Sequence, residues 1–156
     1  MNWEKMTSRE KVERIIQDVM QWVYFPTWHI MHTARWALEH DDPITCPYAF
    51  WSDHQEGIYV FYRDDEYARP FNPLEDMSDA WKIVERLREY PEFVNFEMIY
   101  EQSDKPKVSF TFRNAGHDWD NYPYKHFMHK ADTAVEAICI AALRAVGALD
   151  MQRDNA

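Results

Sequence analysis

The chain has 156 residues, of which 46% are hydrophobic, and a formal net charge of −10. This length predicts a single domain over residues 1–156, with a core large enough to fold without disulfide bonds. The acidic balance argues against duplex DNA and anionic membranes as partners, because affinity for both depends on a basic face.

The first predicted element is a helix over Thr7–Val23. Thr7 and Glu10 have the spacing of a capping box, in which each side chain accepts a hydrogen bond from the backbone of the other residue. Apolar residues recur at helical spacing along one side of the segment, namely Val12, Ile15, Ile16, Val19 and Val23. The pair Phe25-Pro26 is expected to end this helix, because proline cannot continue it.

The middle of the chain is less regular. Trp28–His40 is compatible with either a short helix or a strand. Asp41–Gln55 is predicted as a loop, because two prolines interrupt it. Gly57–Arg63 is rich in β-branched and aromatic residues and predicts a strand, and Asp64–Pro73 predicts a second loop.

Helix and strand patterns are clearest in the second half of the chain. Asp76–Glu89 predicts a helix that begins with an acidic cap and carries an apolar stripe. Phe93–Glu101 and Lys107–Arg113 predict two strands joined by a short turn, and the second of them alternates apolar and polar residues. Tyr124–His129 is compatible with a last strand.

The last predicted helix spans Asp132–Val146, with Gly147 at the position after its C-cap. Few of its residues are charged, and an apolar helix of this kind is usually buried against a sheet and another helix. We therefore expect it to be covered within the fold or at the interface of a homo-oligomer. The order of the elements predicts an α+β layered domain with a mostly antiparallel sheet.

Three segments of the chain resemble one known family. They are NPLEDMSDAWKIVERL, VSFTF and ADTAVEAICIAALRAVG, and VMQW in the first helix also fits. These segments resemble the phage ABA-sandwich domain family, over Val12–Val23 and Asn72–Gly147. The resemblance implies a layered helix–sheet–helix sandwich, a phage origin and action in the cytoplasm of a bacterial host. It also marks residues 27–55 as an insertion, and it implies no catalytic residue and no cofactor.

The histidine and cysteine patterns do not predict a metal site. His29 and His32 are spaced to share one side of a helix, but no third ligand accompanies them. His126 and His129 have the same spacing in a predicted strand, where residues three apart point to opposite faces. Cys139 lies in an apolar helix and is expected to be an inert core thiol.

The segment HDWDNYPYKHFMHK and the strand before it suggest a ligand site. Aromatic faces stack on bases and cations bind phosphates, so a small nucleotide-type ligand fits this composition. The predicted binding residues are Arg113, Trp119, Tyr122, Tyr124, Lys125 and His126, and the insertion adds Trp28, Arg35, Trp36 and Trp51. The alternative is that these rings fill a core that contains few glycines.

Three functions fit these observations. The first is a phage-encoded protein that sequesters a nucleotide-derived signal of host antiviral defence. The second is an inhibitor that places its acidic face on a basic host or phage protein. The third is a hydrolase of the same small ligand, with His117, Asp118 or Asp120 in its site.

Overall fold

The computed structural model describes residues 2–26, 47–114 and 123–149. The fold is α+β, with helices packed against two open and mostly antiparallel sheets. The chain divides into two compact units, Asn2–Asn72 and the residues from Pro73 onward. No helix in the described ranges is long and apolar enough to cross a membrane. The single domain over residues 1–156 and its insertion stay predictions.

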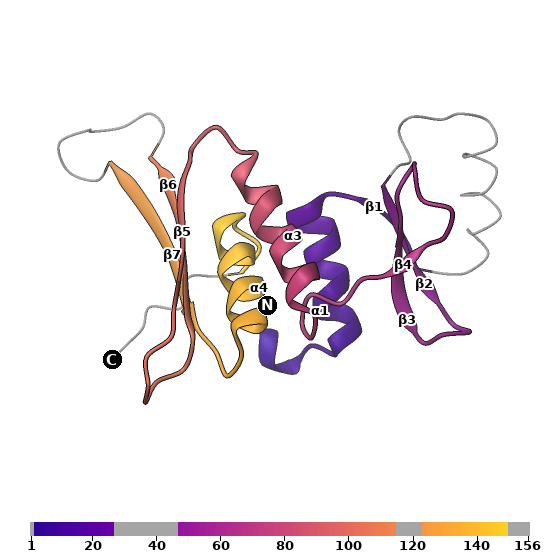
Figure 1. Cartoon of the computed structure of the whole chain (residues 1–156), viewed down its shortest axis with the longest axis horizontal. Coiled ribbons are helices and arrows are strands. Elements are labelled where there is room, and N and C mark those ends of the chain that lie inside the picture. The colour runs from indigo at the N-terminus through magenta and orange to yellow at the C-terminus, as the bar shows by residue number, and fades with distance from the viewer. Residues whose placement is uncertain (1, 27–46, 115–122, 150–156) are drawn as a thin grey trace. The chain divides into compact units, whose positions relative to one another are not determined.

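The Asn2–Asn72 unit begins with a helix whose geometry changes along its length (Figure 1). A short 3-10 helix, η1 (Trp3–Lys5), precedes α1 (Ser8–Arg14), which continues as the π-helical η2 (Ile15–Met20). The predicted capping box is confirmed: the Thr7 hydroxyl accepts from the Glu10 N–H at 3.2 Å, and the Glu10 carboxylate accepts from the Thr7 N–H at 2.8 Å.

The C-terminal end of the predicted first helix was wrong. Gln21 has a φ of 56°, in the left-handed region, and this residue ends the helix. Val23, which the helical pattern included, begins the strand β1 (Val23–Phe25). Left-handed backbone turns the chain out of the helix, and no glycine marks the place in the sequence.

The sheet of the Asn2–Asn72 unit has four strands in the order β1-β2-β3-β4. β1 runs parallel to β2 (Tyr48–Ser52), which pairs antiparallel with β3 (Gly57–Phe61). β4 (Arg69–Pro70) pairs with β3 at the edge. The predicted loops therefore each contain a strand. Pro47 precedes β2 instead of interrupting it, and the aromatic sequence that follows favours a strand.

Aromatic rings form the core of this sheet. Tyr48 and Phe50 are buried, and each stacks on a ring of the next strand, with centroids 5.5 Å apart for Tyr48 and Phe61 and 6.1 Å apart for Phe50 and Tyr59. Phe25 of the parallel strand β1 packs against Tyr48, with the two ring centroids 5.7 Å apart. These five rings therefore pack on one another around the buried Tyr48 and Phe50, and none of them is among the rings predicted to bind a ligand.

Two capped helices lie on one side of a three-stranded sheet in the unit from Pro73 onward (Figure 1). The first, α3 (Met77–Arg88), begins at Asp76, whose Oδ1 accepts from the backbone N–H groups of Ser78 and Asp79 at 2.8 and 3.2 Å. The second, α4 (Ala134–Ala145), begins at Thr133, whose hydroxyl accepts from the Glu136 N–H at 3.2 Å. Both predicted helices are confirmed.

The sheet of this unit has the order β5-β6-β7 and is antiparallel throughout. β5 spans Phe93–Ile99, β6 spans Lys107–Arg113 as predicted, and β7 spans Tyr124–Lys130. α4 packs against β6, β7 and α3, and α3 contacts β5. These contacts cover α4 within one chain and explain why the helix has so little polar surface.

Candidate functional site

The strand β6 divides its side chains between the two faces of its sheet. Val108 and Phe110 are fully buried and point toward the helices. The alternate residues, Lys107, Ser109, Thr111 and Arg113, therefore point to the opposite side. We call this side the outer face. No described helix covers it.

A groove of about 340 Å³ lies on the outer face. Ser109 and Thr111 of the central strand are small, and longer side chains of the edge strands stand on both sides of them. This difference in length leaves a channel above the central strand. The flanking residues are Val94, Asn95, Glu97 and Ile99 of β5 and Tyr124, His126 and Met128 of β7, and Lys107 lies at one end.

Two hydrogen bonds orient polar side chains in the groove. Thr111 Oγ1 and His126 Nδ1 are 2.9 Å apart, and Asn95 Nδ2 donates to Glu97 Oε1 at 3.1 Å. The ion pairs of the described residues include neither Arg113 nor Lys107. Within the described sheet, both cations are therefore available to an anion.

The structure brings three of the six predicted binding residues together. Arg113 and Tyr124 are direct cross-strand partners on the outer face, and His126 follows on the same face of β7. Lys125 pairs with Phe112, so its side chain leaves the opposite face of the sheet. Trp119 and Tyr122 lie outside the described residues.

The sequence did not identify the other side of the groove. Asn95, Glu97 and Ile99 come from a strand far from the predicted segment, and the register of β5 on β6 places them opposite Thr111, Ser109 and Lys107. The polar alternation of Lys107–Arg113 indicated an outer face. No pattern in the sequence indicated which residues of β5 would lie beside it.

One family model matches the chain, the phage ABA sandwich domain, over residues 14–143. The chain belongs to the phage ABA sandwich domain family. No curated protein and no solved structure matches it. In this member of the family, the matched range includes residues 27–55, and their role as an insertion stays a prediction.

The described part of this phage ABA sandwich protein contains no group of three or more histidine, cysteine or acidic residues placed to hold a metal ion. His126 and His129 point to opposite faces of β7, as expected, since they pair with Thr111 and Val108. His29 and His32 lie outside the described residues, as do His117, Asp118 and Asp120 of the hydrolase alternative.

Cys139 has the environment of a core thiol. It is fully buried on α4, and its Sγ donates to the Pro73 carbonyl at 3.5 Å. Burial raises the pKa of the Cys139 thiol far above its ordinary value, because a thiolate would be desolvated there. The nucleophilic form of this side chain is therefore not populated at neutral pH.

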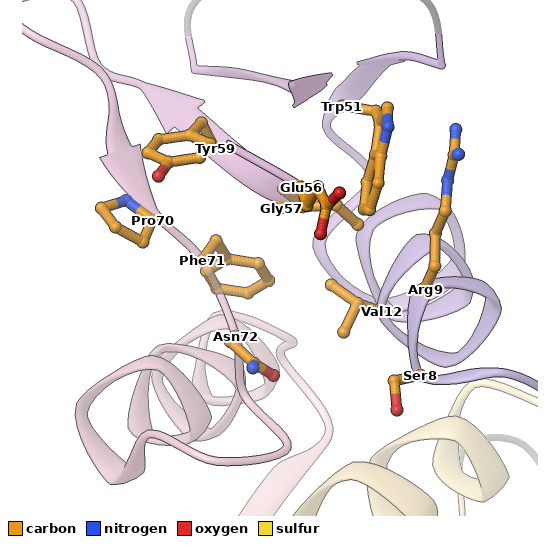
Figure 2. Close-up of a pocket in the computed structure, with 11 residues that line it drawn as sticks. Ser8, Arg9, Val12, Trp51, Glu56, Gly57, Tyr59, Pro70, Phe71 and Asn72 are labelled. Atoms are coloured by element: carbon orange, nitrogen blue, oxygen red, sulfur yellow. The ribbon is translucent and has the colours of Figure 1, made fainter. Parts of the chain in front are cut away.

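A second pocket, of about 260 Å³, lies within the Asn2–Asn72 unit (Figure 2). Its lining includes Trp51, which the sequence suggested as a ring of the insertion. Arg9 of α1 lies over this ring, with its Cζ 4.0 Å from the ring centroid. Trp28, Arg35 and Trp36, suggested with it, lie outside the described residues.

Proposed function

We propose that this phage ABA sandwich protein sequesters a small nucleotide-type signal of host antiviral defence in the cytoplasm of the bacterial host. The ligand binds in the groove on the outer face of the β5-β6-β7 sheet. The observation that supports this function is the cross-strand pair of Arg113 and Tyr124, which places a cation that forms no ion pair with the described residues beside an open aromatic ring.

The pair supplies the two kinds of contact that a nucleotide needs. Side chains of direct cross-strand partners begin about 5 Å apart, so a guanidinium and a phenol ring can contact the same small molecule. Tyr124 is 48% exposed, which leaves a ring face for stacking on a base. The Arg113 guanidinium can bind a phosphate through two parallel N–H donors.

The floor of the groove adds hydrogen-bonding groups. The hydroxyl groups of Ser109 and Thr111 line it, and Thr111 fixes one nitrogen of His126 at 2.9 Å. Among the described residues, the Nε2 atom of that ring is in no hydrogen bond, and we expect it to face a ligand. Hydroxyls and an imidazole recognise a sugar or a base edge by direct hydrogen bonds, which sets orientation in the groove.

The overall charge favours a small ligand over a polymer. The net charge of −10 repels a long polyanion, whose affinity depends on many basic contacts. A mononucleotide or cyclic nucleotide needs only a few local cations, and Arg113 supplies one at the Tyr124 end of β6. An acidic protein with a basic end to one groove can therefore hold such a signal without binding DNA.

The experiment is calorimetric titration of cyclic nucleotides and ADP-ribose derivatives into the full chain. Arg113→Ala and Tyr124→Ala should each weaken binding roughly tenfold or more, since a charged hydrogen bond or a base stack contributes about 1–3 kcal/mol. Lys125→Ala is the matched control, because Lys125 neighbours Tyr124 in sequence but points to the other face. It should bind as the wild type does.

Salt and product analysis complete the test. Arg113→Ala should lose more affinity at low salt than at high salt, because salt already screens an exposed ion pair. Chromatography after incubation should return the ligand intact, whereas a cleaved ligand would establish the hydrolase alternative. If the wild type binds none of these compounds, the proposed function is wrong and the acidic inhibitor remains.

A further inference from the structure

The pocket of the Asn2–Asn72 unit lies between α1 and the hairpin of β2 and β3 (Figure 2). Its walls are mostly apolar or aromatic and include Val12, Trp51, Tyr59, Pro70 and Phe71. A volume of about 260 Å³ is below the range of about 300–1,000 Å³ typical of drug-sized ligands. The pocket therefore suits one flat ring system and not a larger molecule.

Trp51 is held rigidly at this pocket. Its Nε1 donates to Asp53 Oδ1 at 2.8 Å, and the Arg9 guanidinium covers one face of the ring. Arg9 is itself fixed, because its Nε donates to Glu13 Oε1 at 2.8 Å and its Nη2 donates to the Pro26 carbonyl at 3.0 Å. In Figure 2, Phe71 lies on the side of the Trp51 ring opposite Arg9. The second ring face therefore borders the pocket as a preorganised platform.

Glu56 contributes a carboxylate to the same pocket. Its φ of 50° places it in the left-handed region, in the turn that joins β2 to β3. In Figure 2 the carboxylate points into the space between Trp51 and Phe71. The hydrogen bonds and ion pairs of the described residues do not include this carboxylate. The Glu56 side chain is exposed, and a carboxylate acceptor at the edge of an apolar pocket favours a ligand that brings its own N–H donors.

We propose that this pocket is a second binding site, for a planar heteroaromatic ring that carries adjacent N–H donors, which is the chemistry of a guanine-like base. The ring stacks on the Trp51 face opposite Arg9, and its N–H edge donates to Glu56. This site is separate from the groove of the β5-β6-β7 sheet and does not depend on the function proposed for that groove.

Two observations favour a neutral base over the other ligands that an aromatic wall can bind. An organic cation would meet the Trp51 ring with Arg9 already on its far face, so two positive charges would share one ring. A phosphate would meet the Glu56 carboxylate, while the bonds of Arg9 to Glu13 and Pro26 hold the nearest guanidinium in place. A neutral base or nucleoside has neither disadvantage.

Titration of guanosine, inosine and adenosine into the full chain tests this site. Guanosine presents two adjacent N–H donors to one carboxylate, inosine lacks the exocyclic amine, and adenosine lacks the ring N–H. Affinity should therefore fall in that order. Glu56→Gln should weaken guanosine binding roughly tenfold, since the charge-assisted bonds are lost. Glu66→Gln, an exposed acidic residue outside the pocket, is the control and should leave affinity unchanged.

Variants of the platform complete the design. Trp51→Ala should remove guanosine binding, and Trp51→Phe, which keeps a flat ring, should retain part of it. If Trp51→Ala does not fold, guanosine binding by Glu56→Gln still tests the proposal. The proposal is wrong if the wild type does not bind guanosine, or if Glu56→Gln binds it as the wild type does. It is also wrong if Arg113→Ala removes guanosine binding, since the base would then lie on the outer face of the other unit.

Discussion

The two faces of the β5-β6-β7 sheet are built from alternate residues of the same strands and serve different ends. Toward the helices, Val108 and Phe110 have no exposed surface. On the outer face, Thr111 and Tyr124 remain partly open, and no described element covers them. The inward-pointing side chains of β6 thus stabilise the fold, and the outward-pointing side chains of the same strand line the groove. Neighbouring substitutions on β6 should therefore separate stability from binding.

The outer face is not an ordinary solvated surface. Ser109 is only 8% exposed, although none of the described helices packs on it. Its direct cross-strand neighbours are Glu97 and Met128, whose longer side chains shield it from both sides. A polar floor that is partly dehydrated strengthens hydrogen bonds to a ligand, because water competes less for its donors and acceptors.

The largest expected effect comes from the helix-facing side of β6. Phe110→Ala should lower the free energy of unfolding by about 3–5 kcal/mol, because it leaves a cavity beneath α4. Thr111→Ala, one residue away on the outer face, should change it by about 1 kcal/mol or less. Denaturant unfolding of both variants measures the difference. If both variants lost the same free energy of unfolding, the inner face would not be the one that stabilises the fold.

The helices that cover the inner face depend on their caps. Asp76→Ala and Thr133→Ala should each cost about 1 kcal/mol of stability, because each removes a side-chain acceptor for free N–H groups at a helix start. Asp76 accepts two such bonds and Thr133 one, so the first variant should lose more. Thermal unfolding ranks them, with the exposed Asp64→Ala as the control. The reverse order would contradict this account of the caps.

Much of the fold could be predicted from residues close together in sequence. The starts of α1, α3 and α4 follow from local capping patterns, and β6 follows from strict alternation. Sequence reasoning missed β1, because its start depends on left-handed backbone at Gln21, where no glycine gives a signal. It missed β2 because a proline next to a strand was taken to exclude one.

The candidate site was predictable only in part, for a physical reason. That Lys125 would point away from Tyr124 and His126 follows from strand alternation, and the sequence could have shown it. That Arg113 would lie beside Tyr124 depends on the register between two strands joined through residues 114–123, which no local pattern sets. The contribution of β5 to the groove is equally non-local.

The smallest expected effect lies at the rim, where the turn after β5 meets the end of β7. The Lys130 ammonium donates to Asp104, and this hydrogen bond, helped by the Lys105 N–H, lowers the pKa of the Asp104 carboxyl from its ordinary value of 3.8. A carboxyl with a lowered pKa stabilises the fold fully above its ordinary pKa. That stabilisation is lost as the pH falls through the lowered value.

Asp104→Asn should therefore have a slightly lower unfolding midpoint than the wild type at neutral pH, measured by thermal unfolding. The two midpoints should converge in acid, once the wild-type carboxyl is protonated. Because both partners are exposed and salt screens them, added salt should also reduce the difference. A difference that grew in acid would contradict the assigned direction of the pKa, and one as large as that of Phe110→Ala would mean that the rim, like the inner face, is part of the core.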